Sequence, residues 1–236
     1  MLNNLSADFQ IIFKRDPAAC NWLEVLVCYP GIQALFWHRM AHFLYCRQIP
    51  FIPCGISYFV RFVTGIEIHP GAKIGKGVFI DHGMGVVIGE TAIVGDYSTI
   101  YQGVTLGGTG KKQGKRHPTV GQNVVVGAEA KVLGNIQIGD NVQIGSGSVV
   151  LRNIPSDCTV VGIPGRIVRR QGKLVNNESL PDPEAEVIRA LFDKIQALEA
   201  EVNRLKATRG LVSVVNTHIP HKDNLLIENF LDGAGI

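Results

Sequence analysis

The feature that most constrains the fold is a six-residue recurrence of aliphatic side chains between residues 66 and 165. The frame shifts by two once, and it is interrupted once. The fourteen positions are Ile68, Ile74, Ile80, Val86, Ile88, Val94, Ile100, Leu106, Val120, Val126, Val132, Ile138, Ile144 and Val150. A period of six fits neither a single α-helix nor a hairpin sheet. It is typical of hexapeptide repeats, in which short strands and turns coil into a parallel β-helix.

Glycine supports this prediction, because it directly follows the aliphatic residue in many units. The positions are Gly75, Gly89, Gly95, Gly107, Gly121, Gly127, Gly139 and Gly145. We expect the aliphatic side chains to fill the core of a prism and the glycines to serve its tight corners. A glycine-rich loop region would not show this periodicity, so residues 66–170 are predicted to be a β-helix domain.

The regions on either side of the repeat have different sequence patterns. Residues 1–65 contain few glycines and are predicted to be a helical region, with helices over Pro17–Tyr29, Ile32–Arg47 and Gly55–Val63. Residues 171–206 are predicted to be a linker followed by a helix, and residues 207–236, which lack a repeat, a flexible tail.

The helix predicted near the C-terminus carries a heptad seam. Its apolar positions are Ile188, Leu191, Ile195, Leu198, Val202 and Leu205. The seam is shorter than three heptads, so the helix could pack on the β-helix or pair with another copy. β-branched residues alternating with leucine favour two strands, whereas hexapeptide β-helices usually form trimers, and the sequence leaves this conflict open.

Composition excludes several classes of protein. A net charge of +3 is too small to indicate a nucleic-acid or membrane-surface partner. There is no apolar run of the ~20 residues needed to span a membrane, and the first ten residues do not resemble a signal peptide. The five cysteines form no CxxC pair, and four lie in apolar helical surroundings where cysteine usually acts as a small hydrophobe. We therefore expect a cytoplasmic protein without disulfides.

The repeat is interrupted by the segment GGTGKKQGKRHPT between Leu106 and Val120. It contains four cations and no acid: Lys111, Lys112, Lys115 and Arg116. A loop that leaves a solenoid is often its binding face, and cations next to glycine amides suit a phosphate or carboxylate. The alternative is a solvated surface loop.

Histidines are the next candidates. His82 follows Asp81 within the frame shift of the repeat, and a polar pair at a break in the pattern suggests an active site, although an outward-facing corner histidine is the alternative. His38 and His42 have a spacing that can bind metal, but the HExxH pattern is absent. We interpret these two as packing or surface residues.

Three segments together resemble the serine O-acetyltransferase family: GIEIHPGAKIGKGVFIDHGMGVVIGE, TLGGTGKKQGKRHPTV and GAEAKVLGNIQIG, with RDPAA at Arg15–Ala19 upstream. The resemblance covers residues 10–170 and is closest to the short form of the family. It implies a helical cap, a left-handed parallel β-helix and a homotrimer or dimer of trimers with active sites between β-helices. The fold class is therefore α+β.

The resemblance also implies the reaction and the roles of individual residues. Acetyl-CoA, the co-substrate, would donate its acetyl group to L-serine, opening cysteine biosynthesis. His82 would be the general base and Glu67, where the family often has Asp, would orient its imidazole. Asp16 and Asp81 would hold the serine ammonium group. An Asp-Pro pair at Asp16 is also typical of a helix start.

The remaining implied roles concern the carboxylate, the co-substrate and the partners. Arg116 and His117 would clamp the serine carboxylate. The co-substrate would contact the backbone around Gly108, Thr109 and Ala128. No bound cofactor or metal is expected.

L-cysteine would inhibit, and the C-terminal Ile236 would dock into O-acetylserine sulfhydrylase. Two alternatives remain. The chain could be an acetyltransferase for another hydroxyl or amine, which would not need the amino-acid clamp, or a scaffold that regulates the sulfhydrylase through Ile236.

Overall fold

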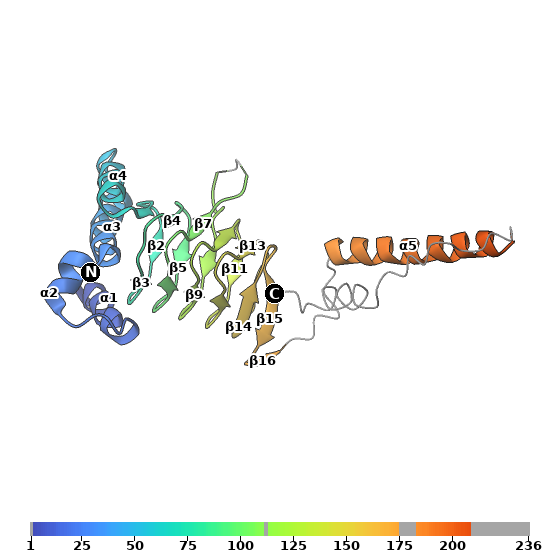
Figure 1. Cartoon of the computed structure of the whole chain (residues 1–236). Coiled ribbons are helices and arrows are strands. Elements are labelled where there is room, and N and C mark those ends of the chain that lie inside the picture. The colour runs from blue at the N-terminus through green and yellow to red at the C-terminus, as the bar shows by residue number, and fades with distance from the viewer. Residues whose placement is uncertain (1, 111–112, 175–182, 209–236) are drawn as a thin grey trace. The chain divides into compact units, whose positions relative to one another are not determined.

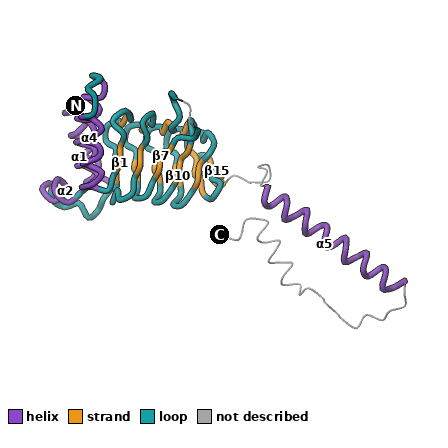
Figure 2. Tube along the Cα trace, turned by 90° about the horizontal axis from the view of Figure 1, so that it is seen from above, coloured by secondary structure: helices purple, strands orange, loops and turns teal. Residues whose placement is uncertain are grey.

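The computed structural model describes residues 2–110, 113–174 and 183–208, and the chain divides into two units, residues 1–176 and 177–236. The first unit is a left-handed parallel β-helix with helices at its N-terminal end, as predicted (Figure 1). Figure 2 shows the coils stacked one on the next, with short strands joined by turns.

The strands form three sheets, which we call A, B and C. Sheet A contains β1 (Glu67–Ile68), β4 (Val87–Ile88), β7 (Thr105–Gly107), β10 (Lys131–Leu133) and β13 (Val149–Val150). Sheet B contains β2 (Lys73–Ile74), β5 (Ile93–Val94), β8 (Thr119–Val120) and β11 (Gln137–Ile138). Sheet C contains β3 (Phe79–Ile80), β6 (Thr99–Ile100), β9 (Val125–Val126), β12 (Gln143–Ile144), β14 (Cys158–Val161), β15 (Arg166–Arg170) and β16 (Lys173–Leu174).

The core consists of the predicted aliphatic ladder. All fourteen positions are buried except Ile74, which is half-buried. Ile68 pairs with Ile88, twenty residues on, whereas Ile88 pairs with Leu106, eighteen residues on. The two extra residues of the first coil lie in the turn between β3 and β4, which contains His82. The frame shift in the sequence is therefore an enlarged corner.

The glycines that follow the aliphatic residues lie at the corners of the coil. They do not supply left-handed backbone: the positive-φ residues lie elsewhere in the turns, as at Gly77 and Asn123. Instead they allow close stacking of coils, because a Cβ at Gly95 would lie 2.3 Å from the carbonyl oxygen of Gly121 in the next coil. These glycines therefore lie at the corners, as predicted, and their role there is close approach between coils.

The N-terminal region contains four helices: α1 (Leu2–Arg15), α2 (Trp22–Cys28), α3 (Pro30–Cys46) and α4 (Ile52–Thr64). The sequence prediction missed α1 and began the next helix too early, at Pro17. The Asn21 side chain accepts a hydrogen bond from the Leu23 N–H and so starts α2 there. Asp16 accepts from the Ala18 N–H, but it caps a turn and not a helix.

Helix α1 is held by tertiary contacts, which explains why its own sequence was not diagnostic. Asp8 is fully buried and pairs with Arg39 of α3 at 2.6 Å. Its other carboxylate oxygen accepts from the Gly77 N–H at 2.8 Å. This buried pair ties α1, α3 and the first coil together, and its satisfied hydrogen bonds offset the cost of burying charge.

The cysteine prediction was also wrong in part. Cys158 is buried, but Cys20, Cys28, Cys46 and Cys54 are exposed: Cys20 lies in the connection between α1 and α2, and the other three lie on helices with their side chains turned away from the core. All five are free thiols.

The C-terminal end of the first unit extends beyond the predicted boundary at residue 170. Strands β15 and β16 pair antiparallel with the edge of sheet C as far as Leu174, which terminates the parallel coil. In the second unit, α5 (Pro183–Thr208) carries the heptad seam, and its residues from Leu191 to Leu205 expose their apolar side chains. Among the described residues no helix is long and apolar enough to cross a membrane.

Candidate active site

His82 lies at the enlarged corner where sheet C passes into sheet A, which we call the His82 corner. Its backbone is left-handed, with φ of 57°, and its side chain is 76% exposed. Hydrogen bonds from Gly83 N–H to the Asp81 carbonyl and from Met84 N–H to the His82 carbonyl hold the turn. The imidazole Nε2 lies 4.0 Å from Asp81 Oδ1. The corner thus presents an accessible imidazole next to a carboxylate.

Two carboxylates converge on this corner. The hydrogen bond from the Tyr29 hydroxyl to Asp16 Oδ2, 2.6 Å long, is the main cause that lowers the pKa of Asp16. The same bond raises the pKa of Tyr29 to about 12, so the phenol stays protonated. Burial raises the pKa of Asp81, with the Asp16 charge acting in the same direction and His82 opposing it. Two neighbouring carboxylates with an imidazole favour a bound cation such as an ammonium group.

Glu67 lies on β1, and its backbone N–H donates a hydrogen bond to the carbonyl of Val86 at the end of the His82 turn. Its side chain points outward, because Ile68 takes the core position, and Glu67 Oε2 pairs with Arg61 at 3.0 Å. In the structure, the ionic partner of His82 is Asp81 and not Glu67. The orienting role of Glu67 stays a prediction.

Arg116 and His117 lie at a different corner, where sheet A passes into sheet B, which we call the Arg116 corner. The Arg116 guanidinium pairs with Glu90, and this hydrogen bond lowers the pKa of Glu90. Arg116 NH1 also donates to the Gly114 carbonyl at 3.4 Å. The guanidinium fork is therefore oriented at the rim of the inserted loop.

The hydrogen bonds of His117 fix its tautomer. Thr91 Oγ1 accepts the N–H groups of Arg116 and His117, so its own hydroxyl is free to donate to His117 Nδ1 at 2.9 Å. The Thr91 N–H donates to the same nitrogen at 3.2 Å. Nδ1 is thus an acceptor and the proton is on Nε2. Burial, followed by the Arg116 charge, lowers the pKa of His117, so it is a neutral donor.

Sequence reasoning missed three residues of this corner: Tyr45, Glu90 and Thr91. The Tyr45 hydroxyl donates to Glu90 Oε1 at 3.3 Å, and the ring lies edge-on to His69 with centroids 5.8 Å apart. Burial lowers the pKa of His69. The register of the coils could have identified these residues. Because Ile68 pairs with Ile88 of the next coil, the residues that follow each of them must stack at the same corner.

The residues implied for the co-substrate also divide between the corners. Gly108 and Thr109 begin the inserted loop after β7, at the Arg116 corner. Ala128 follows β9 and lies at the C-to-A edge, above His82. A Cβ at Gly108 would lie 3.1 Å from His117 Nε2, so this backbone passes directly over the histidine.

The structure therefore brings Asp16, Asp81 and His82 together, and separately brings Arg116 and His117 together. Within the β-helix, sheet A separates the His82 corner from the Arg116 corner. Among the described residues no group of three or more His, Cys, Asp or Glu side chains could hold a metal ion. Ile236, Lys111 and Lys112 lie outside the described residues.

A hexapeptide-coil prism with an exposed histidine and a cationic loop at its corners is the arrangement of a hexapeptide-repeat acyltransferase. The family model for bacterial transferase hexapeptide repeats matches residues 117–152. A serine acetyltransferase of Synechococcus elongatus is 62% identical over 100% of both chains. The chain therefore belongs to the serine acetyltransferase family.

Solved structures of serine acetyltransferases are also similar to this chain. The serine acetyltransferase of Neisseria gonorrhoeae in complex with serine is 40% identical with a TM-score of 0.69, covering 71% of this chain and 69% of that one. The enzyme of Brucella abortus in complex with coenzyme A is 41% identical with a TM-score of 0.70, covering 74% and 69%. A serine acetyltransferase in complex with cysteine is 40% identical with a TM-score of 0.70, covering 72% and 66%.

Proposed function

We propose that this chain transfers the acetyl group of acetyl-CoA to the hydroxyl of L-serine, with His82 as general base, and so opens cysteine biosynthesis. The observation that carries the proposal is the pair of complementary sites: two carboxylates beside His82 and a guanidinium beside His117. These match the ammonium and carboxylate of an amino acid. The solved relatives with bound serine and coenzyme A support the choice of substrates.

In the proposed step, the His82 imidazole accepts the proton of the serine hydroxyl as that oxygen attacks the thioester carbonyl. A neutral imidazole is a suitable base near pH 7. The coenzyme A thiolate leaves readily, so the step needs no second catalytic acid. Glu67 would orient the imidazole through the carboxylate oxygen that does not bind Arg61.

Serine would be bound by its two charged ends. Asp16 and Asp81 hold the ammonium group, while Arg116 offers the carboxylate the N–H groups that Glu90 leaves free. The His117 Nε2–H donates to the same carboxylate. L-cysteine has the same charged ends and would occupy the same clamp as an inhibitor, which the cysteine-bound relative supports.

We further propose a homotrimer, or a dimer of trimers, with each active site shared between two β-helices. The division of the amino-acid clamp between two corners supports this proposal, because threefold symmetry can place the His82 corner of one copy against the Arg116 corner of the next. The backbone of Gly108 and Thr109 from one copy and of Ala128 from its neighbour would then flank the co-substrate.

The other parts of the chain have proposed roles as well. The helical region, residues 1–65, caps the catalytic β-helix, residues 66–170. The linker and helix, residues 171–206, lead to the tail, residues 207–236, whose Ile236 would dock into O-acetylserine sulfhydrylase. A cytoplasmic location fits this role in amino-acid synthesis.

The test is release of the coenzyme A thiol from acetyl-CoA and L-serine by the purified full chain, with L-threonine, a sugar acceptor and no acceptor as controls. The matched variant is His82→Asn, because asparagine tolerates the left-handed backbone of this position. We expect serine-dependent release that falls about 10²- to 10⁴-fold in the variant. No serine-dependent release from the folded protein would overturn the proposal.

A further inference from the structure

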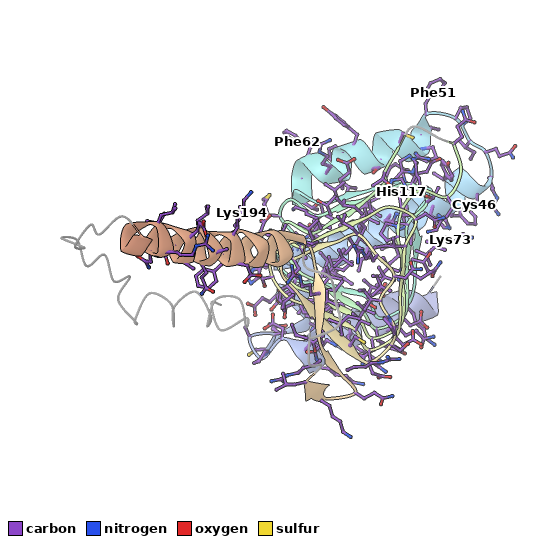
Figure 3. All side chains as sticks on the ribbon, turned by 90° about the vertical axis from the view of Figure 1, so that its right-hand side faces the viewer. Cys46, Phe51, Phe62, Lys73, His117 and Lys194 are labelled. Atoms are coloured by element: carbon purple, nitrogen blue, oxygen red, sulfur yellow. The ribbon has the colours of Figure 1, made fainter. Side chains whose placement is uncertain are left out.

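A second cluster of reactive side chains lies outside the clamp, along the C-terminal half of α3. His42 and Cys46 are one helical turn apart, and the Cys46 Sγ lies 3.5 Å from His42 Nε2. They face an open cavity of about 580 Å³ between α3 and the first coil, whose other lining residues include Tyr45 and Lys73. Figure 3 shows Cys46 and Lys73 on the same flank of the molecule.

The tautomer of His42 is set by the backbone. His42 Nδ1 lies 2.7 Å from the Pro70 carbonyl oxygen, which can only accept, so Nδ1 carries the proton. In the neutral ring, Nε2 therefore carries a lone pair that faces the Cys46 thiol. A thiol next to an oriented imidazole can transfer its proton to the ring and become a nucleophilic thiolate. Cys20, Cys28 and Cys54 are also exposed.

The charge of Lys73 indicates what the cavity binds. Lys73 supplies a cation on the opposite wall, which suits a carboxylate. His38 lines the adjoining lobe of about 390 Å³, is 5% exposed, and its Nδ1 has no hydrogen-bond partner. Burial is the main cause that lowers the pKa of His38 to about 3, so its ring is neutral. A ligand that carries a carboxylate is therefore suited to this cavity.

The cavity is connected to the Arg116 corner through one side chain. Tyr45 lines the cavity next to Cys46, and its hydroxyl donates to Glu90, the partner of Arg116. A group attached to Cys46 would displace Tyr45 and so change how Glu90 holds the Arg116 guanidinium. Tyr45 is thus a positioning residue for the clamp.

We propose that Cys46 is a thiol–disulfide exchange site for a small disulfide that bears carboxylate groups, and that the resulting mixed disulfide weakens serine binding at Arg116. The Cys46 thiolate, having given its proton to His42, attacks one sulfur of the disulfide. The sulfur–sulfur bond of the disulfide breaks, a new one forms to Cys46, and the other half leaves as a thiolate that takes the proton. The effect on serine rests on the proposed function; the exchange reaction does not.

The first experiment measures labelling of the full chain by glutathione disulfide, with peptide mapping by mass spectrometry over time. Cys20, Cys28 and Cys54 serve as controls within the same molecule. We expect Cys46 to react at least about tenfold faster than these three. In His42→Asn, which keeps an N–H for Pro70, the Cys46 rate should fall to that of the controls. Equal rates in the unmodified chain, or a rate unaffected by His42→Asn in a protein with unchanged melting, would overturn the exchange site.

The second experiment measures the KM for serine before and after labelling. We expect a rise of about threefold or more that dithiothreitol reverses and that Cys46→Ser prevents. Labelled Cys46 with an unchanged KM would overturn the link to Arg116. If the untreated chain shows no serine acetylation, the proposed function fails, and the labelling rates still decide the exchange site.

Discussion

At the scale of single residues, the site depends on side chains whose hydrogen-bonding roles are fixed by neighbours. Thr91 accepts two backbone N–H groups and thereby directs its own hydroxyl to His117. Tyr29 holds Asp16 ionised beside Asp81. His117 and Asp16 are thus each oriented by a partner that does not touch the proposed substrate, which limits the reorganisation needed on binding.

The guanidinium fork of Arg116 is predicted to be essential for the carboxylate. In Arg116→Lys the charge remains, but the planar pair of N–H donors shared by Glu90 and the substrate is lost. We expect the KM for serine to rise about tenfold or more and the KM for acetyl-CoA to stay within about twofold. Steady-state kinetics test this, with Arg47→Lys, an arginine stacked on Phe43, as the control. An unchanged KM for serine would remove Arg116 from the clamp.

His38 is predicted to make stability depend on pH. Its pKa in the folded chain is about 3 because of burial, whereas an unfolded histidine titrates near pH 6.5. Between these values the unfolded chain binds the extra proton, so stability falls as the pH falls. We expect His38 to contribute a loss of about 2 kcal/mol between pH 6.5 and pH 5.

Urea unfolding at both pH values, at one protein concentration, measures this loss. His69 and His117 also have lowered pKa values and act in the same direction, so the informative quantity is the difference between the unmodified chain and His38→Gln. An equal loss in both proteins would contradict the prediction.

At the scale of the elements, the coil spacing explains both the stability of the prism and the position of the site. Eighteen residues complete an ordinary coil, and the two extra residues of the first coil enlarge the corner that presents His82. The inserted loop enlarges the Arg116 corner in the same way. The proposed catalytic and binding residues therefore lie where the repeat is broken, while the aliphatic ladder continues beneath them.

The glycines that stack coil on coil give a prediction at this scale. In Gly95→Ala the new Cβ would lie 2.3 Å from the Gly121 carbonyl oxygen, so the coils must separate. We expect a cost of about 1–3 kcal/mol. Gly55→Ala is the matched control, because nothing lies within 4 Å of its new Cβ and it lies within α4, where alanine favours the helix by up to about 1 kcal/mol. Equal urea midpoints for the two variants would contradict the close-stacking role.

At the scale of the whole molecule, the separation of the two corners is the main finding. His82 and Arg116 lie at opposite edges of sheet A, so we expect the proposed site, which uses both corners, to need a second copy. Mixing and refolding two inactive variants, His82→Asn and Arg116→Ala, tests this. In random trimers about one quarter of the sites would combine an intact His82 corner with an intact Arg116 corner.

We expect the mixture to recover activity toward that fraction of the unmodified protein, while each variant refolded alone stays inactive. Recovery should depend on subunit exchange, so mixing without refolding is the control. A refolded mixture as inactive as its components would place both corners in one chain's site and contradict the shared arrangement.

The sequence by itself determined the β-helix, because a side chain every sixth residue must point into the same core wherever the coil repeats. It also marked both corners of the site, since the frame shift at His82 and the loop at Arg116 break that repeat. It did not reveal α1, whose position depends on the buried Asp8–Arg39 pair, or the partners Tyr45, Glu90 and Thr91.

The tertiary structure alone decided how these residues are grouped. It paired Glu67 with Arg61, turned four cysteines outward and put the residues proposed to bind the ammonium group and those proposed to bind the carboxylate at different corners. The physical reason is that a period along the chain fixes which way a side chain points, whereas a site depends on which coils, helices and copies lie beside it.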